Sequence, residues 1–210
     1  MWIQLDGDED LDLLEAAADQ AVREIKEAAG DDVELTPHFR RGDEDKAWAH
    51  VSLSRPFALR RQEIEGFTEE LQKACRVTQN FDIELRCSNW VTLPSEDGQR
   101  TFLAFEVDFD KAALRRLIQN LDTVLGIYGK APYYSSPRFH VTFAHTTSPA
   151  ARLEALRGNG NRALAGAEAG AGRKDPEDGS TSDVEEPSFE AEAIMFKAGN
   201  ITAQVPLFRA

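Results

Sequence analysis

The apolar positions of this chain repeat with two different periods, and the change from one period to the other predicts an alternation of helices and strands. Apolar residues spaced three and four apart are typical of a helix buried on one side, and they occur at 10–29, 61–78 and 110–126. Shorter stretches of alternating or continuous apolar residues predict strands. These lie at 2–5, 33–35, 47–54, 81–87, 101–107, 138–145, 188–196 and 201–207. Turn residues at 94–98 predict that the strands on either side form a hairpin.

The pattern is interrupted between residues 158 and 186, where Gly, Ala, Asp, Glu and Ser leave almost no large apolar residue. Such a segment buries too little surface to offset the entropy lost on ordering, so we expect a disordered acidic insertion at 158–186. The order strand, helix, strands, helix, strands predicts an α+β fold of two lobes. We expect one domain over 1–210, with the lobes facing each other across a cleft.

Two of the predicted strands carry the same polar pattern, one in each half of the chain. Residues two apart on a strand point the same way, so His140 and Thr142 share a face while Val141 lies on the other. His50 and Ser52 repeat this arrangement. A single His-x-Ser/Thr triplet is more simply explained as a core histidine whose ring is hydrogen-bonded to a nearby group. Because polar groups are costly to bury, its repetition favours one site shared by both strands.

Two imidazoles that face each other can divide a proton transfer, because one accepts a proton from a nucleophile while the other donates one to a leaving group. Histidine suits both roles, since its ordinary pKa of about 6.5 leaves both protonation states accessible near neutrality. When the substrate is RNA, its own 2′-hydroxyl supplies the nucleophile, and no metal is required. Ser52 and Thr142 would then donate hydrogen bonds to the non-bridging phosphate oxygens as charge builds there.

A metal site is an alternative for the four histidines, which are His38, His50, His140 and His145. The odd spacing of five residues predicts that His145 points to the face of its strand opposite His140. No cluster of acidic ligands accompanies the four. We therefore expect no metal and no cofactor. The two cysteines lack the spacing of a metal or redox pair, and we interpret them as reduced apolar residues.

The net charge of −13 looks unfavourable for a nucleic-acid partner, but the acidic excess lies near the ends of the chain. Residues 1–45 hold 15 acids and 4 bases, and residues 166–190 hold 8 acids and 2 bases, whereas residues 46–165 hold 16 bases and 13 acids. This distribution of charge argues against non-specific binding along a nucleic-acid duplex more than against a small site that binds an RNA end. No apolar run of about 18 residues predicts a membrane span, and no signal-peptide pattern opens the chain, so we expect a soluble intracellular protein. Trp2 so close to the start is consistent with the loss of a preceding segment.

Four stretches carry a resemblance to a known family. They are 50–55 (His-Val-Ser-Leu-Ser-Arg), 100–107 (Arg-Thr-Phe-Leu-Ala-Phe-Glu-Val), 133–140 (Tyr-Tyr-Ser-Ser-Pro-Arg-Phe-His) and 196–200 (Phe-Lys-Ala-Gly-Asn). The paired His-x-Ser/Thr motifs resemble those of the 2H phosphoesterase superfamily, and the longer stretches resemble the U6 snRNA phosphodiesterase family within it. The resemblance implies a two-lobed α+β fold with pseudo-twofold antiparallel sheets and flanking helices. It also implies a 3′-to-5′ exoribonuclease that trims the uridine tail of the U6 spliceosomal RNA in the nucleus, leaving a 2′,3′-cyclic phosphate or a 3′-phosphate.

The same resemblance implies roles for individual residues. His140 is the base toward the 2′-hydroxyl, His50 is the acid toward the leaving 5′-oxygen, and Tyr134 stacks on the terminal base. The family's second motif has Ser and a following Trp where this chain has Thr142 and His145, and the threonine keeps the hydroxyl donor. Candidates for binding the RNA backbone are Arg55, Arg138 and Lys130.

Two other functions stay open for the same residues. A 2′,3′-cyclic phosphodiesterase would use the acid–base pair to activate water at an RNA end. A non-catalytic module would use the two histidines only to hold a terminal phosphate. In each case the expected partner is a single-stranded RNA 3′ end, which is uridine-rich in U6 snRNA, and we expect no membrane partner and a monomer.

Overall fold

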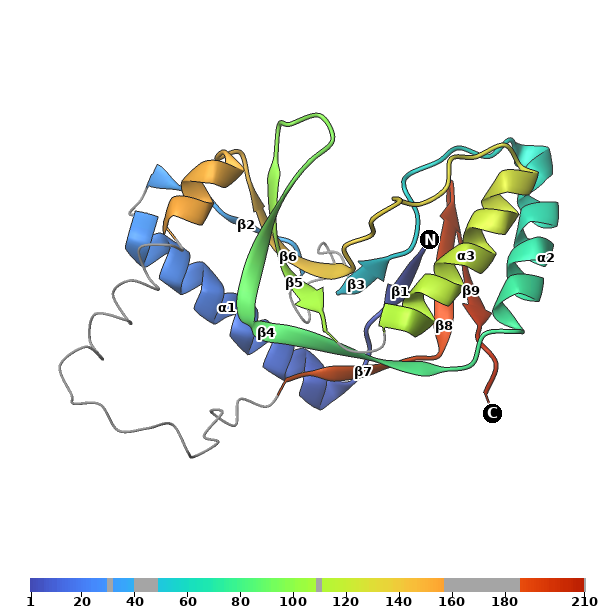
Figure 1. The fold of residues 1–210 in the computed structure, drawn as a ribbon, viewed down its shortest axis with the longest axis horizontal. Coiled ribbons are helices and arrows are strands. Elements are labelled where there is room, and N and C mark those ends of the chain that lie inside the picture. The colour runs from blue at the N-terminus through green and yellow to red at the C-terminus, as the bar shows by residue number, and fades with distance from the viewer. Residues whose placement is uncertain (30–31, 40–48, 109–110, 157–185, 210) are drawn as a thin grey trace.

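The computed structural model describes residues 1–29, 32–39, 49–108, 111–156 and 186–209 (Figure 1). Within these residues the strands form one antiparallel sheet in the order β7-β4-β5-β6-β3-β1-β8-β9, and β2 pairs with β6. The strands are β1 Trp2–Gln4, β2 Thr36–Pro37, β3 His50–Ser52, β4 Phe81–Pro94, β5 Thr101–Val107, β6 His140–Thr146, β7 Ser188–Ala191, β8 Ala193–Ala198 and β9 Ile201–Pro206. The helices are α1 Asp8–Ala29, α2 Ile64–Cys75, which follows the 3-10 turn η2 Arg61–Glu63, and α3 Lys111–Ile127. Residues 150–156 are also helical.

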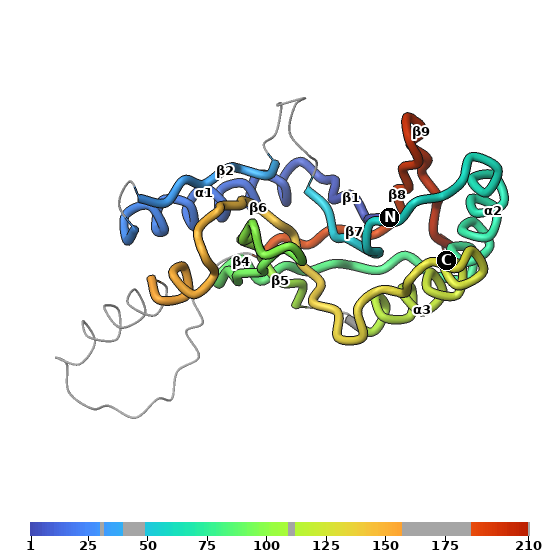
Figure 2. Tube along the Cα trace, turned by 90° about the horizontal axis from the view of Figure 1, so that it is seen from above, coloured from blue at the N-terminus to red at the C-terminus, as the bar shows by residue number. Residues whose placement is uncertain are grey.

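The helices cover the two halves of the sheet separately. α1 packs against β4 and β6, while α2 packs against β8, β9 and α3. Figure 2 shows α1 on one side of the molecule and α2 with α3 on the other. In Figure 1 the hairpin β4–β5 rises on one side of the β3–β6 pair and the helices α2 and α3 rise on the other. Different helices therefore cover the β4–β6 part of the sheet and the β8–β9 part.

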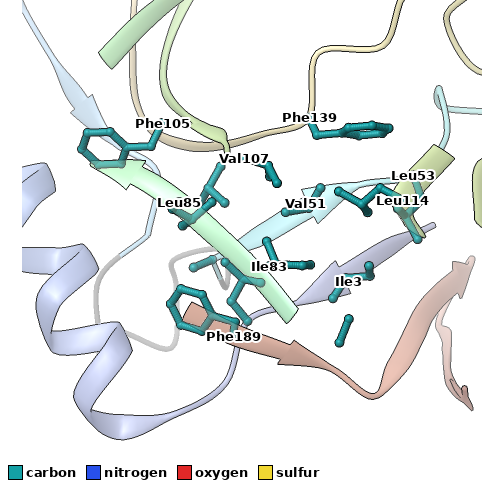
Figure 3. Close-up of a cluster of buried hydrophobic side chains, with 14 of the residues drawn as sticks. Ile3, Val51, Leu53, Ile83, Leu85, Phe105, Val107, Leu114, Phe139 and Phe189 are labelled. Carbon is teal, nitrogen blue, oxygen red and sulfur yellow. The ribbon is translucent and has the colours of Figure 1, made fainter. Parts of the chain in front are cut away.

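The core lies on one face of the strands, because alternate residues of each strand point the same way. Figure 3 shows Ile3, Val51, Ile83 and Val107, from four different strands, gathered with Phe189 of β7. All five are at most 1% exposed. Since these positions fill one face of β1, β3 and β5, the other face of these strands is left for polar side chains.

The two motif strands are hydrogen-bonded neighbours, and this corrects the expectation of separate sheets facing across a cleft. β3 pairs antiparallel with β6 through Val51 and Val141. Each strand would otherwise be the exposed edge of its half, and an unpaired edge leaves backbone donors and acceptors without partners. Joining the edges satisfies these groups and produces one continuous sheet.

The expected helices and most of the expected strands are confirmed, but the strand at 33–35 is wrong. The chain pairs instead at β2, where Thr36 lies opposite His145 and Pro37 opposite Ala144. The expected strand at 188–196 is broken at Glu192, because β7 pairs with β4 whereas β8 pairs with β1 and β9. The insertion predicted at 158–186 falls almost wholly outside the described residues, so it and the single-domain assignment stay predictions.

Candidate active site

Two rows of side chains cross four strands on the face opposite the core. The pairing of β5 with β6, of β6 with β3 and of β3 with β1 aligns them. One row contains Glu106, His140, Ser52 and Trp2. The other row contains Ala104, Thr142, His50 and Gln4. The structure thus brings both predicted histidines and both predicted hydroxyls onto one surface.

The two histidines lie on a diagonal of this surface. Because Val51 pairs with Val141, the next positions set His50 opposite Thr142 and Ser52 opposite His140. Diagonal neighbours in an antiparallel pair are about 7–8 Å apart at their Cα atoms, which leaves room for one phosphate between two imidazoles. The arrangement has a local twofold relation about the valine pair, since each histidine lies beside the hydroxyl of the other motif.

A backbone carbonyl determines which nitrogen of His140 carries the proton. Nδ1 lies 2.6 Å from the carbonyl oxygen of Arg138. A carbonyl oxygen can only accept a hydrogen bond, so Nδ1 must be the donor, and Nε2 of the neutral ring keeps its lone pair. Burial lowers the pKa of His140 and the nearby His50 lowers it further, while the hydrogen bond to the Arg138 carbonyl opposes them and raises it. At neutral pH His140 is therefore in the form that accepts a proton.

The two hydroxyls are half-buried, as are the two histidines. Ser52 lies between His140 on one side and Trp2 on the other, and Thr142 lies between His50 and Ala104. Hydroxyls in such positions can donate to an anion held by the imidazoles. Removing one such donor from a reaction centre typically costs about 10²–10³ in rate.

His145 lies on the same face as His140, which overturns the expectation that it points away. β6 contains a bulge: Leu103 pairs with Ala144 and Ala104 with Thr142, so Phe143 has no partner on β5. The extra residue reverses the alternation beyond it. His145 consequently lies opposite Phe102, with ring centroids 6.3 Å apart, on the polar face.

His38, which the sequence offered only as a candidate metal ligand, lies on the face of the site. It follows β2, and its backbone N–H donates to the carbonyl of Phe143 at 2.8 Å. Its ring centroid lies 6.2 Å from that of His50 and 6.2 Å from that of His145. His38 therefore neighbours two of the other imidazoles on this face. No strand pattern could have revealed this, because β2 is only two residues long.

Glu106 is a residue that the sequence did not single out, although it lies directly beside His140. It is paired with His140 across β5 and β6, and its carboxylate raises the pKa of that histidine, opposing the larger effect of burial. Its oxygen Oε1 also accepts from Nε and Nη2 of Arg138, at 2.9 and 2.8 Å. The alternation of 101–107 was the available signal, because it sets Glu106 opposite the buried face.

Tyr134, the predicted stacking residue, lies in the loop before β6 and is 39% exposed. Its hydroxyl donates to Oε1 of Glu96 at 2.7 Å, and this bond raises its pKa. The guanidinium carbon of Arg55 lies 4.0 Å from the centroid of its ring. Tyr133 is buried and contacts Phe139 by stacking, so only the second tyrosine of the pair is offered to solvent.

The three predicted backbone-binding cations all have carboxylate partners. Arg138 pairs with Glu106, and Nζ of Lys130 lies 3.8 Å from Oε2 of Glu63. Nη1 of Arg55 lies 3.8 Å from Oε1 of Glu96. Such partly exposed pairs are weak, so each cation can exchange its carboxylate for a phosphate.

Among the described residues there is no group of three or more His, Cys, Asp or Glu side chains arranged to hold a metal ion. None of the helices in the described part of the chain is both long enough and apolar enough to cross a membrane. Cys75 is buried and Cys87 is half-buried, and both are free thiols. Burial raises the pKa of each to about 12, so both stay protonated at neutral pH.

Comparisons with known proteins find both a family and solved structures that resemble this chain. Residues 7–206 match the family described as "HVSL: Uncharacterised conserved protein". A U6 snRNA phosphodiesterase 1 of Dictyostelium discoideum is 30% identical over 96 residues, covering 45% of this chain and 34% of that protein. The same-named protein of Xenopus laevis is 28% identical over 158 residues, covering 75% of this chain and 58% of that protein. The chain thus spans about a third of the length of the Dictyostelium protein and somewhat over half of the length of the Xenopus protein.

Solved structures share the fold. Usb1 of Kluyveromyces marxianus superposes with a TM-score of 0.62 at 18% identity, covering 98% of this chain and 96% of that one. Its structure with uridine monophosphate gives a TM-score of 0.60, also at 18% identity, covering 99% and 96%. The match over residues 7–206 shows that the chain belongs to the HVSL family, and the two curated relatives that it resembles are both named U6 snRNA phosphodiesterase 1.

Proposed function

We propose that this protein is a metal-independent 3′-to-5′ exoribonuclease that removes uridines from the 3′ end of U6 snRNA. The observation that carries the proposal is the diagonal of His50 and His140 on one sheet face, with Ser52 and Thr142 on the other diagonal. The names of the relatives, and the uridine monophosphate in the Kluyveromyces Usb1 structure, support the substrate class. Because U6 is a spliceosomal RNA, the proposal implies a nuclear location.

The reaction is a transfer of the phosphorus from one oxygen of the RNA to another. Nε2 of His140 accepts the proton of the 2′-hydroxyl of the penultimate nucleotide, and that oxygen forms a bond to the phosphorus. The bond from the phosphorus to the 5′-oxygen of the terminal nucleoside breaks, and His50 donates a proton to that oxygen. The products are a 2′,3′-cyclic phosphate end and a nucleoside. If the two histidines then exchange their acid and base roles, water can attack the cyclic phosphate and open it to the 3′-phosphate.

The protein's contribution is positioning and charge stabilisation. The Arg138 carbonyl holds the His140 ring with Nε2 directed away from the backbone. Ser52 and Thr142 donate to the non-bridging oxygens, on which charge increases in the transition state. Each proton transfer contributes about 10²–10⁴ in rate, so loss of either histidine is nearly disabling. Tyr134 offers an exposed ring on which the terminal base stacks, worth about 1–3 kcal/mol per base.

The proposal is tested with an RNA that ends in five uridines, incubated with the protein in EDTA. We expect stepwise shortening from the 3′ end by the wild type, and a loss of at least about 10² in rate for His50→Gln and His140→Gln. His145→Gln is a matched control, since it changes a histidine on the same face outside the diagonal pair. If activity is lost in EDTA and recovers with Mg²⁺, the metal-independent mechanism is wrong.

The position of the nucleophile is tested with two RNAs that differ in one methyl group. A 2′-O-methyl group on the penultimate nucleotide should block the first cut, because that oxygen attacks the phosphorus. The same group on the terminal nucleotide leaves the attacking hydroxyl intact and should permit the cut. Equal cleavage of both RNAs would contradict the mechanism. Mass spectrometry of the shortened RNA distinguishes a cyclic phosphate from a 3′-phosphate, and binding without shortening would favour a non-catalytic module.

A further inference from the structure

Three segments of the chain meet through Arg55, Tyr134 and Glu96. Arg55 follows β3, Tyr134 precedes β6, and Glu96 lies in the turn between β4 and β5. Oε1 of Glu96 accepts the tyrosine hydroxyl at 2.7 Å and lies 3.8 Å from Nη1 of the arginine. The guanidinium carbon lies 4.0 Å from the centroid of the tyrosine ring. One face of that ring is therefore covered by a cation.

The arginine is incompletely satisfied in this position. Nε of Arg55 is buried and has no hydrogen-bond partner. The distance of 3.8 Å to Glu96 is too long for a hydrogen bond, so the ion pair is only coulombic. A guanidinium is best satisfied by two parallel hydrogen bonds to a carboxylate or a phosphate. Its present contacts are those of a group that gains by exchanging partners.

Tyr134, by contrast, does not need the arginine to keep its place. Its hydroxyl is held by Glu96, and its neighbour Tyr133 is anchored by a backbone N–H that donates to Asp122 at 2.7 Å. The ring can therefore stay where it is when the guanidinium leaves. The face that the guanidinium uncovers is flat and aromatic.

We propose that Arg55 exchanges partners when RNA binds: it yields the face of Tyr134 to the terminal base and takes up a phosphate of the same RNA. The inference rests on the proposed function, in which that base stacks on the tyrosine. Arg55 is only three residues beyond Ser52, so its Cα lies within about 11 Å of the serine that contacts the scissile phosphate. A long side chain starting there reaches that phosphate or its neighbour. Arg55 is thus a substrate-binding residue that also occupies the empty stacking site.

The exchange predicts that removing Arg55 has opposite effects on two probes. Uridine offers a base and no phosphate, so Arg55→Ala removes only a competitor, and we expect uridine to bind about two- to fivefold more tightly. The dinucleotide deoxyuridylyl-(3′→5′)-uridine also offers a phosphate and cannot be cleaved, because the attacking hydroxyl is absent. We expect its affinity to fall about tenfold, since a charged hydrogen bond is lost. Titration of the full chain followed by NMR measures both.

Two further variants separate the exchange from simpler effects. Arg100→Ala removes the same charge from the hairpin that carries Glu96 and should leave both affinities within about twofold of wild type. Arg55→Lys keeps the charge but loses the planar group, so it should recover part of the dinucleotide affinity. Because Arg55 is half-buried at the surface, thermal unfolding of its variants should match that of wild type, which checks that each is folded.

Opposite signs for the two probes support the exchange, whereas equal signs or no change overturn it. If Arg55→Ala weakens both probes, the arginine is a contact without being a competitor. If it strengthens both, the arginine is a competitor without a phosphate role. If wild type shortens uridine-tailed RNA while Arg55→Ala changes neither affinity, only the exchange is wrong. Failure of wild type to bind either probe overturns the proposed function together with the exchange.

Discussion

The pKa of His140 connects the burial of this side chain to the pH dependence of the proposed reaction. Burial lowers this pKa below the ordinary value of about 6.5, and the base is active only when deprotonated. As pH falls, kcat/KM should therefore hold through pH 6.5 and decline only below it. A pH–rate profile measured from pH 4.5 to 8 checks this. An acidic limb at or above pH 6.5 would contradict the assignment of His140 as base.

Glu106 gives a second test of the same residue. Its carboxylate raises the pKa of His140, as does the hydrogen bond to the Arg138 carbonyl, while the charge of the Arg138 side chain lowers it. Glu106→Gln removes one of the two raising influences, so the acidic limb should move to still lower pH. Asp108→Asn serves as the control, because Asp108 is paired with Arg86 rather than with His140. A limb that stays in place for Glu106→Gln would show that the carboxylate does not act on the base.

Thr142 tests whether the hydroxyl or only the shape of the side chain matters. Thr142→Val keeps the volume and removes the donor, so we expect kcat to fall by about 10²–10³. Thr142→Ser keeps the donor and should stay within a fewfold of wild type. Single-turnover rates on a uridine-tailed RNA measure both. Equal loss in the two variants would assign the threonine to packing instead of to the phosphate.

At the scale of an element, the bulge in β6 decides which residues face the site. Phe143, the unpaired residue, is 2% exposed and stacks on Phe105 with ring centroids 4.6 Å apart. The bulge is therefore held by a packed aromatic pair. Beyond it the alternation is reversed, so His145 joins the polar face and Ala144 the core.

Truncating this side chain should be costly to the fold. We expect Phe143→Ala to lower the free energy of unfolding by about 3–5 kcal/mol, because it leaves a cavity in the core. Urea unfolding at 25 °C measures the loss. Ile201→Ala on β9 is the control, since that side chain is 59% exposed and its removal should change stability by about 0.5 kcal/mol or less. Equal effects would mean that the bulge is not anchored by Phe143.

Features that depend on local periodicity could be predicted from the sequence, whereas features that depend on strand pairing could not. Alternation correctly set His140 with Thr142 and His50 with Ser52, and helical spacing located α1, α2 and α3. The bulge has no signature in 138–145, so the predicted face of His145 was wrong. Likewise, β2 forms only because Thr36 pairs with His145 on the neighbouring strand β6. Such contacts join residues distant in sequence, which local patterns do not encode.

At the scale of the whole molecule, the junction of the two halves creates the site. Neither half holds more than one histidine of the pair, and β3 contributes only three residues to the sheet. Pairing of Val51 with Val141 both closes the sheet and fixes the diagonal. The strand pairing that joins the two halves of the fold therefore also brings the proposed catalytic pair together. The repeated motif predicted a shared site, but it did not show that the two strands pair directly.

The distribution of charge sets how the whole molecule should respond to salt. The net charge is −13, and each predicted RNA-binding cation already has a carboxylate within 4 Å. Only two or three phosphates can then be neutralised, and each contributes about −0.7 to the slope of log affinity against log salt for a single strand. We expect a slope of about −1.5 to −2 for a uridine-tailed RNA, measured between 50 and 300 mM KCl with an uncleavable substrate. A slope steeper than about −4 would require an extended basic surface, and would contradict a site that holds only the RNA end.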